Sequence, residues 1–572
     1  MKFNNILVLA AAFGLSLASC NDFLDVAPVD DIEDSDYWQT EDHIRIYANG
    51  FYPTYFTGYA GNFGYNEKLT DNFSDVIQDS WPYIVASGSD ANYTYSRVLR
   101  ANYFLAGVER VPNLDEATRN HWLGVGRLFR GYEYANMSFT YGDTQWYTTR
   151  INSTQTDSLY KARDSRDKVV MPRVIADLRF ALDNIREDDG DLQVNKYVAA
   201  AMIARVMLRE GTYLKYHDIN AEMGRKCLQL AKDACLVVMN SSKYTLADDY
   251  HALFYSEDLE GNPEVILRKR YIDTKGGHNV LNTNYLLPQT GPNRDFADAF
   301  LGADGHPVYE RDANYCPKTT ADYFANRDPR LSMVIRPDKY YIAGEDVAGA
   351  AYSRSGFSMW KYMNPEKQTS TDNIYTANNK NITDCPQFRL GEILVSYAEI
   401  CYELGSLTQA DLDKSINVLR ARKGVNMPAL QIIGGQPAVA DVVYDDPMRD
   451  ADVPAMLWEI RRERRVEMAF EGSRLDDLKR WKKLIYLWSE YNENIGTGAY
   501  ISLADYPKAD NTKVVLPQGQ TEGYLVVTTA GNRRPAPQAH DYIRPIPADQ
   551  IQIFAQNGYA DNLKQNPEWA TK

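Results

Sequence analysis

The sequence predicts a mainly α-helical fold, with helix pairs in two regions and an irregular, loop-rich region between them. Apolar residues recur at helical spacing within about 93–240 and again within about 388–485. Between these regions, residues 270–385 are rich in Asn, Asp, Gly, Tyr and Pro and show little helical period. Helical runs on either side of an irregular region indicate a helical scaffold that carries the loops.

The first half of the chain predicts several helices. One with its aromatic residues to one side is expected from residue 36 to about 56, and another over 121–143. The clearest pair lies over 197–240, where small alanines permit a close helix approach. Its facing stripes are Ala200, Ile203, Ala204, Met207 and Leu208 on one helix, and Leu228, Ala231, Cys235 and Val238 on the other.

The second helical half begins at Phe388. Its first helix is expected to end at Gly405, and Thr408 is placed to cap a further helix that stops at Gly424. Residues 262–266 predict a short strand, whereas residues 486–541 are less regular and are interpreted as an insertion.

Residues 460–481 predict a helix, a tight turn at Gly472 and a second helix capped by Ser473. Five consecutive charges over 461–465 cover every face of the first helix, so at least one must face a partner helix and be paired. We interpret these charges as a structural ion-pair network rather than as acid–base catalysts. Helical spacing predicts two attractive pairs, Glu459–Arg462 and Arg464–Glu467.

The composition disfavours some functions. The 572 residues carry a formal net charge of −15, which argues against a nucleic-acid partner because such a partner requires a basic face. Tyr (41 residues) outnumbers Phe (19 residues). A tyrosine ring with its polar tip suits a hydrated binding surface, although most of these rings are expected to pack between helices.

The N-terminus has the pattern of a secretory signal. Lys2 precedes a mostly apolar run over 6–17, which is too short to span a bilayer. Residues 17–20 read Leu-Ala-Ser-Cys and resemble a bacterial lipobox. We expect a signal peptide over 1–19, acylation of Cys20 and a tether over 20–35, so that the protein reaches the membrane only through its lipid anchor.

No catalytic or metal-binding motif is present. His-Glu-x-x-His, Cys-x-x-Cys, Walker and Gly-x-Ser-x-Gly patterns are missing. The acidic run 187–191 is a weak cation candidate that we interpret as a solvated turn. We expect no catalytic residue, no metal and no cofactor; calcium could assist binding, but no motif indicates it. The five cysteines beyond residue 20 are interpreted as small core residues: Cys227, Cys235, Cys316, Cys385 and Cys401.

An ordered set of motifs resembles the SusD/RagB family of outer-membrane nutrient-binding lipoproteins. The resemblance runs from Cys20 to Trp569 and is carried by the start at 20–28, the helix over 121–143 ending in Tyr-Gly-Asp, the Pro-Glu segment at 263–264, Arg-Asp-Pro-Arg at 327–330, the helix pair over 388–424, the stretch 460–481, and the endings 542–547 and 563–569. It implies a single SusD-like domain over 36–572, with four tetratricopeptide-like helix pairs packed against a loop-rich half.

The resemblance also implies a function. The expected protein is an outer-membrane lipoprotein that faces the cell exterior, binds oligosaccharide or polysaccharide and delivers it to a SusC-like TonB-dependent transporter. Some relatives bind peptides, so a peptide-binding RagB-like protein is the alternative. A helical-repeat scaffold for other proteins and a glycoside hydrolase, which needs only two placed carboxylates, are further alternatives. We expect no enzymatic activity.

Sugar binding predicts the residue types to seek in the loop-rich half, over about 57–91 and 270–385. An aromatic ring stacks on a sugar, and Asn, Asp, Gln or Arg side chains bond its hydroxyls. Trp81 is the foremost candidate because the adjacent Pro82 favours a rigid, non-helical presentation. The candidates are Tyr65, Asn66, Asp79, Trp81 and Tyr83 in the first region, and Tyr285, Arg294 and Trp360 in the second.

Overall fold

The computed structural model describes residues 37–59, 67–75, 88–149, 151, 154–272, 276–281, 290–345, 353–366, 379–529 and 533–570. The expected signal peptide, Cys20 and the tether up to residue 35 lie outside these residues. Within the described ranges, no helix has an apolar stretch of the length that a membrane crossing requires.

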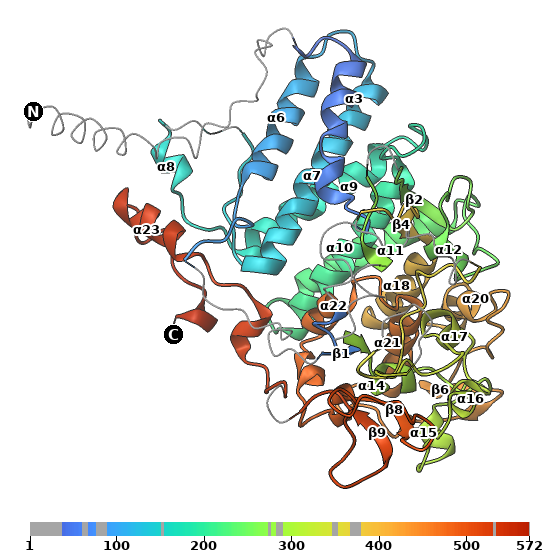
Figure 1. Cartoon of the computed structure of the whole chain (residues 1–572). Helices are drawn as coiled ribbons and strands as arrows, with labels where there is room; N and C mark the ends of the chain where they lie inside the picture. Colours follow the sequence, from blue (N-terminus) through green and yellow to red (C-terminus); the bar gives the residue numbers. More distant parts are fainter. Residues whose placement is uncertain are drawn as a thin grey trace, which may run out of the picture.

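The N-terminal helices lie side by side at one end of the molecule (Figure 1). They are α3 (Glu41–Asn49), α6 (Ser96–Arg110), α7 (Glu116–Tyr141) and α9 (Met171–Asn184). Asp115 caps α7, since its side chain accepts a hydrogen bond from the Thr118 backbone. The helix expected over 121–143 is confirmed as part of α7, whereas the helix expected from residue 36 is divided into α3 and the short α4 (Tyr52–Tyr55).

The helices α10 (Lys196–Tyr216) and α11 (Ala221–Met239) form the expected close pair, and every residue of the two predicted stripes is buried. Two glycines permit the approach. A Cβ atom on Gly211 would lie 2.8 Å from the carbonyl oxygen of Gly224 and 2.7 Å from Leu228 Cγ. The backbones therefore pass closer than side chains would allow.

Replacing Gly211 by alanine is expected to lower the free energy of unfolding by about 1–3 kcal/mol, because α10 and α11 must separate to admit the methyl group. Urea denaturation of a chain from residue 21 onward measures the change. Gly88→Ala is the control, since no atom lies within 4 Å of an added Cβ there. Equal stability of Gly211→Ala and the unsubstituted protein would contradict the expectation.

The second helical half contains α18 (Leu390–Glu403), α19 (Gln409–Asp413), α20 (Ile416–Arg420), α21 (Ala455–Glu467) and α22 (Arg474–Arg480). The cap at Thr408 is confirmed, because its side chain accepts from the Asp411 backbone. The prediction of one helix up to Gly424 is wrong, since α19 and α20 are separate. Ser473 is also not the predicted cap: its backbone is already helical and its side chain makes no capping bond.

Four helix pairs thus follow one another along the chain, as predicted: α7 with α9, α10 with α11, α18 with α19 and α20, and α21 with α22. In the irregular half, the strands pair antiparallel as β1 (Phe73–Asp75) with β3 (Thr290–Pro292), β2 (Val265–Lys269) with β4 (Cys385–Arg389), β5 (Gln431–Ile433) with β6 (Gln436–Val439) and β7 (Val442–Val443), and β8 (Thr497–Ser502) with β9 (Glu522–Val526). Strand β2 confirms the short strand expected near residue 265.

Short helices fill the rest of the described chain: α8 (Thr156–Leu159), η2 (Arg166–Val170), α12 (Ala252–Tyr255), α14 (Arg294–Asp298), α15 (Val308–Arg311), α16 (Thr320–Phe324), α17 (Arg330–Val334), η4 (Leu484–Leu487), η5 (Glu493–Gly496), η6 (Ala539–Tyr542), α23 (Ala548–Gln556) and η7 (Pro567–Trp569). The helical half and the loop-rich half each have a large hydrophobic core. Strand β4 contributes Phe388 to the first core and Cys385 to the second, and so joins the two halves.

Four of the five cysteines beyond residue 20 are buried, in agreement with the interpretation as core residues. Cys316 is the exception, because it is exposed on the irregular segment between α15 and α16. The interpretation of Cys316 as a core residue was therefore wrong.

A buried ion-pair network joins the helices, as the charges over 461–465 predict. Glu459 and Arg462 form the expected pair at 3.1 Å. The expected pair of Arg464 with Glu467 is wrong. Arg464 instead reaches across to Asp477 of α22 at 2.8 Å, and Glu467 is occupied by three arginines from other segments.

The network makes stability depend on pH. Burial opposes the ionisation of Glu399, but the Arg480 guanidinium at 2.6 Å outweighs it and lowers the pKa of Glu399 to about 2. Since the unfolded carboxyl has a pKa of about 4.3, its contribution is complete above that value and is lost as the pH falls toward 2.

We expect Glu399→Gln to lower the free energy of unfolding at pH 7 and to flatten its decline between pH 5 and pH 2. Urea denaturation at a series of pH values tests this. Parallel curves for the variant and the unsubstituted protein would show that folding does not lower the pKa of Glu399.

Candidate ligand-binding site

One small sheet brings together the two regions from which the candidates were chosen. Strands β1 and β3 pair so that Asp75 lies opposite Thr290. The chain leaves β1 at Asp75 towards the segment with Asp79, Trp81 and Tyr83, and enters β3 at Thr290 from the segment with Tyr285. The two segments are therefore attached at the same end of the same sheet.

Arg294 begins α14 directly after this sheet. Its capping residue, Asn293, donates to the carbonyl oxygens of Asp71 beside β1 and of Ile495 in η5. This buried asparagine ties β1, α14 and η5 together. Figure 1 shows α14 near the β8–β9 hairpin, at the end of the molecule away from α3 and α6.

A recess of about 380 Å³ lies between α14, η5 and the β8–β9 hairpin. We call it the tyrosine recess, since Tyr500 of β8 and Tyr524 of β9 are register partners that line it. Their ring centroids lie 5.4 Å apart at an interplanar angle of 89°. The remaining lining residues are Arg294, Glu493, Asn494, Thr497, Pro517, Gln520, Glu522, Gly523 and Val526.

Arg294 packs against one of the rings of the tyrosine recess. Its guanidinium carbon lies 3.6 Å from the centroid of the Tyr524 ring, which fixes one face of that ring. Arg294 also donates to Asp298 at 3.2 Å and to the Tyr309 hydroxyl at 2.8 Å. Burial disfavours its charge, but Asp298 outweighs burial and raises the pKa of Arg294, so the side chain stays cationic.

This arrangement suits a polyhydroxylated ligand. Two half-buried tyrosine rings set edge to face give apolar surfaces in two orientations, on which the CH face of a sugar can stack. Asn494 and Gln520 offer amide donors and acceptors, and Glu493 and Glu522 offer acceptors for hydroxyl groups. The tyrosine recess is therefore an aromatic platform with a polar rim.

The structure places two of the predicted site residues. Arg294 is at the tyrosine recess, as a support for Tyr524. Trp360 is not an exposed stacking platform: it is only 8% exposed, Arg336 lies 4.6 Å over its ring, and its carbonyl oxygen contacts the His251 ring. The remaining candidates, Tyr65, Asn66, Asp79, Trp81, Tyr83 and Tyr285, lie outside the described residues.

Sequence reasoning missed Tyr500 and Tyr524 because both lie in the region interpreted as an insertion. A signal was present: the short apolar runs over 499–501 and 524–527 contain aromatic and β-branched residues, which are typical of strands. The pairing that brings the two rings together is not visible in the sequence.

The acidic run 187–191 is largely the solvated turn that was expected, since Glu187, Asp188 and Asp191 are exposed. Asp189 is almost fully buried and pairs with Arg45 at 2.5 Å, and Asp191 pairs with Arg268 at 2.9 Å. Across the residues that the structure describes, no group of three or more His, Cys, Asp or Glu side chains is arranged to hold a metal ion.

These features define a class of protein, in which a helical-repeat scaffold supports an irregular half that carries an aromatic, hydrogen-bonding recess. The chain belongs to the SusD family, whose sequence model matches residues 263–569. SusD-like protein P38 of Formosa agariphila is 23% identical to it over 526 residues, which cover 86% of this chain and 94% of the relative.

Solved structures show the same fold. A SusD-like carbohydrate-binding protein from Bacteroides fragilis superposes with a TM-score of 0.65 at 21% identity, covering 92% of this chain and 100% of the other. A laminarin-binding SusD-like protein superposes with a TM-score of 0.54 at 17% identity, covering 92% and 99%. Surface glycan-binding protein A from Bacteroides fluxus gives a TM-score of 0.57 at 16% identity, with the same coverage.

Proposed function

We propose that this protein is a surface lipoprotein that binds an oligosaccharide or polysaccharide and passes it to a SusC-like TonB-dependent transporter, without cleaving it. Membership of the SusD family carries the proposal. Structural relatives are described as carbohydrate-binding and laminarin-binding proteins, which supports a glycan as the ligand.

The tyrosine recess supports the same ligand class. Its volume of about 380 Å³ matches the lower range of pockets that hold small organic ligands, so one or two sugar rings would enter it at a time. A longer glycan would extend along the surface toward the segments attached to β1 and β3. Those segments carry the candidates Trp81 and Tyr285.

The lipobox at residues 17–20 supports attachment to the outer membrane through Cys20. We expect Cys20→Ala to abolish lipid incorporation and to move the protein out of the washed membrane fraction.

Affinity capture of the full-length protein from detergent-solubilised outer membrane would test whether a transporter is the partner. Recovery of a TonB-dependent barrel is the expected result, and its absence from an otherwise intact preparation would contradict the delivery step.

Calorimetric titration of the chain from residue 21 onward against neutral glycans tests the ligand. Saturable binding of one glycan class, with the glycan recovered intact, is the expected result. Cleaved glycan would indicate a hydrolase instead. A mixed peptide pool belongs in the same experiment, because binding of peptides alone would replace the glycan by a peptide cargo.

A further inference from the structure

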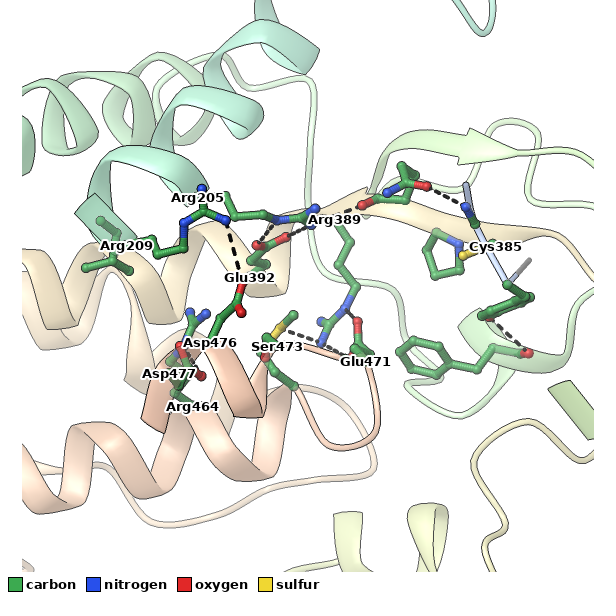
Figure 2. Close-up of a pocket in the computed structure, with 18 of the residues that line it drawn as sticks. Arg205, Arg209, Cys385, Arg389, Glu392, Arg464, Glu471, Ser473, Asp476 and Asp477 are labelled. Atoms are coloured by element: carbon green, nitrogen blue, oxygen red, sulfur yellow. Dashed lines mark hydrogen bonds and ion pairs between the residues drawn. The ribbon is translucent and has the colours of Figure 1, made fainter. Parts of the chain in front are cut away.

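A second hollow lies where the turn between α21 and α22 meets α10 and β4 (Figure 2). We call it the charged pocket. Its volume is about 240 Å³, and it shares no lining residue with the tyrosine recess. Arginine and carboxylate side chains from α10, α18, α21 and α22 form one part of its wall, and the rings of Tyr59, Tyr132 and Phe254 form an apolar part.

Three of the four carboxylates that line the charged pocket are already satisfied, and the fourth, Asp476, is half exposed. Arg205 donates to both oxygens of Glu392 at 2.6 Å. Asp477 accepts from Arg464 at 2.8 Å and from Arg480 at 2.9 Å. Glu471 likewise accepts from Arg389 and from Lys361. These groups have little capacity left for a cationic ligand.

Several hydrogen-bond donors in the same wall are not satisfied. Arg464 is only 5% exposed, and its Nε and Nη1 donate to Asp477 and Ser396. Within the described part of the chain, no bond is made by Arg464 Nη2, by Arg205 Nη1 or by the Ser473 hydroxyl. Arg209 Nη1 approaches Asp476 only to 3.5 Å, and its buried Nε has no partner.

The donors without protein acceptors indicate that a ligand of the charged pocket would be negatively charged. Arg209 Nε is buried without an acceptor, which costs free energy, and a guanidinium binds a carboxylate better than it binds a neutral group. Figure 2 shows Ser473 between the Glu471 and Asp476 side chains, with Arg205 and Arg209 on neighbouring turns of α10. A ligand that brings acceptor oxygens into this space would meet donors from three separate elements.

We propose that the charged pocket binds a small organic carboxylate of about the size of one sugar ring. Its volume is below that of most sites for larger ligands, which excludes an extended chain. The carboxylate would face Arg209, Arg464 and Ser473, and the body of the ligand would face Tyr132. This inference does not depend on the proposed glycan-delivery function.

Calorimetric titration with D-glucuronate at constant ionic strength tests the charged pocket in the chain from residue 21 onward. Saturable binding is expected, and D-glucose, which has the same ring but no carboxylate, is expected not to bind there. Arg209→Gln should weaken glucuronate binding by about tenfold or more, because a charged donor is lost. Ser473→Ala should weaken it by about threefold, without disturbing any existing hydrogen bond.

Arg179→Gln is the matched control, because Arg179 is an arginine on α9 that pairs with Asp233 and does not line the charged pocket. It should bind glucuronate as the unsubstituted protein does, and neutral-glycan binding should be unchanged in Arg209→Gln. Absence of glucuronate binding, or binding that survives both Arg209→Gln and Ser473→Ala, would overturn the proposal. Binding of inorganic sulfate without binding of glucuronate would also overturn the proposal.

Discussion

Replacing Glu467 by glutamine is expected to lower the free energy of unfolding by about 3–5 kcal/mol. Its carboxylate is fully buried and accepts from Arg389 at 2.6 Å, from Arg422 at 3.1 Å and from Arg330 at 3.3 Å. Burial opposes its ionisation, but these three cations outweigh burial and hold the pKa of Glu467 well below its ordinary value. Removing this charge leaves the buried cluster one negative charge short, although Glu264 still pairs with Arg389 and Arg422, and Asp328 with Arg330.

The cost is expected to be large because one buried cation is left without a matching negative charge. Arg422 already has two buried N–H groups, at Nε and Nη1, without a hydrogen-bond partner. Glutamine keeps the shape of the side chain, so the experiment isolates the charge. Urea denaturation measures the loss, and far-ultraviolet circular dichroism before denaturation shows whether the variant is folded.

The matched control is Lys423→Gln, which breaks the ion pair with Asp248 at 2.6 Å. Both side chains of this pair are 74% exposed, so water and salt screen it and no measurable loss is expected. If Glu467→Gln is no less stable than Lys423→Gln, the buried network does not hold α21 against β4 and α17.

The helices could be predicted where local signals agreed. The stripes over 197–240 define α10 and α11 because both faces of that pair are apolar at helical spacing. Between α19 and α20 the local signal misleads. Ser415 has a hydroxyl that hydrogen-bonds to the Asp411 carbonyl oxygen and a backbone outside the helical region, and so it interrupts a run that is helical in pattern.

The sequence predicts that the charges over 461–465 are paired, but it identifies only some of their partners. Five charges in a row require partners, and the helical spacing correctly identifies Glu459 with Arg462. The partners of Glu467 come from α17, β4 and the end of α20. Such contacts depend on how distant segments meet, which periodicity cannot show.

The sequence predicted which kinds of side chain to expect at the candidate site, but not at which positions they lie. Arg294 follows a strand that the sequence did not reveal, and Trp360 is in the core because a bridge between Ile335 and Met359 places it there. Tyr500 and Tyr524 come together through the pairing of β8 with β9. A single sequence shows strand-forming residues within each segment but not the register between the two segments.

Tyr524→Ala is expected to weaken glycan binding by about tenfold, which corresponds to a loss of about 1.4 kcal/mol. Arg294 fixes the Tyr524 ring from one side and Tyr500 meets it edge to face, so a sugar gains a platform without ordering a mobile side chain. Tyr524→Phe keeps the ring and should keep most of the affinity. This pair of variants separates stacking from hydrogen bonding by the hydroxyl group.

Tyr491→Ala is the control, because Tyr491 is 45% exposed and does not line the tyrosine recess. Its affinity for the glycan identified by the titration panel should equal that of the unsubstituted protein. If Tyr524→Ala and Tyr500→Ala both retain full affinity while the glycan still binds, the tyrosine recess is not the site. The segments attached to β1 and β3 would then be the place to substitute next. Trp81 would come first, because water cannot take the place of an aromatic ring stacked on a neutral sugar.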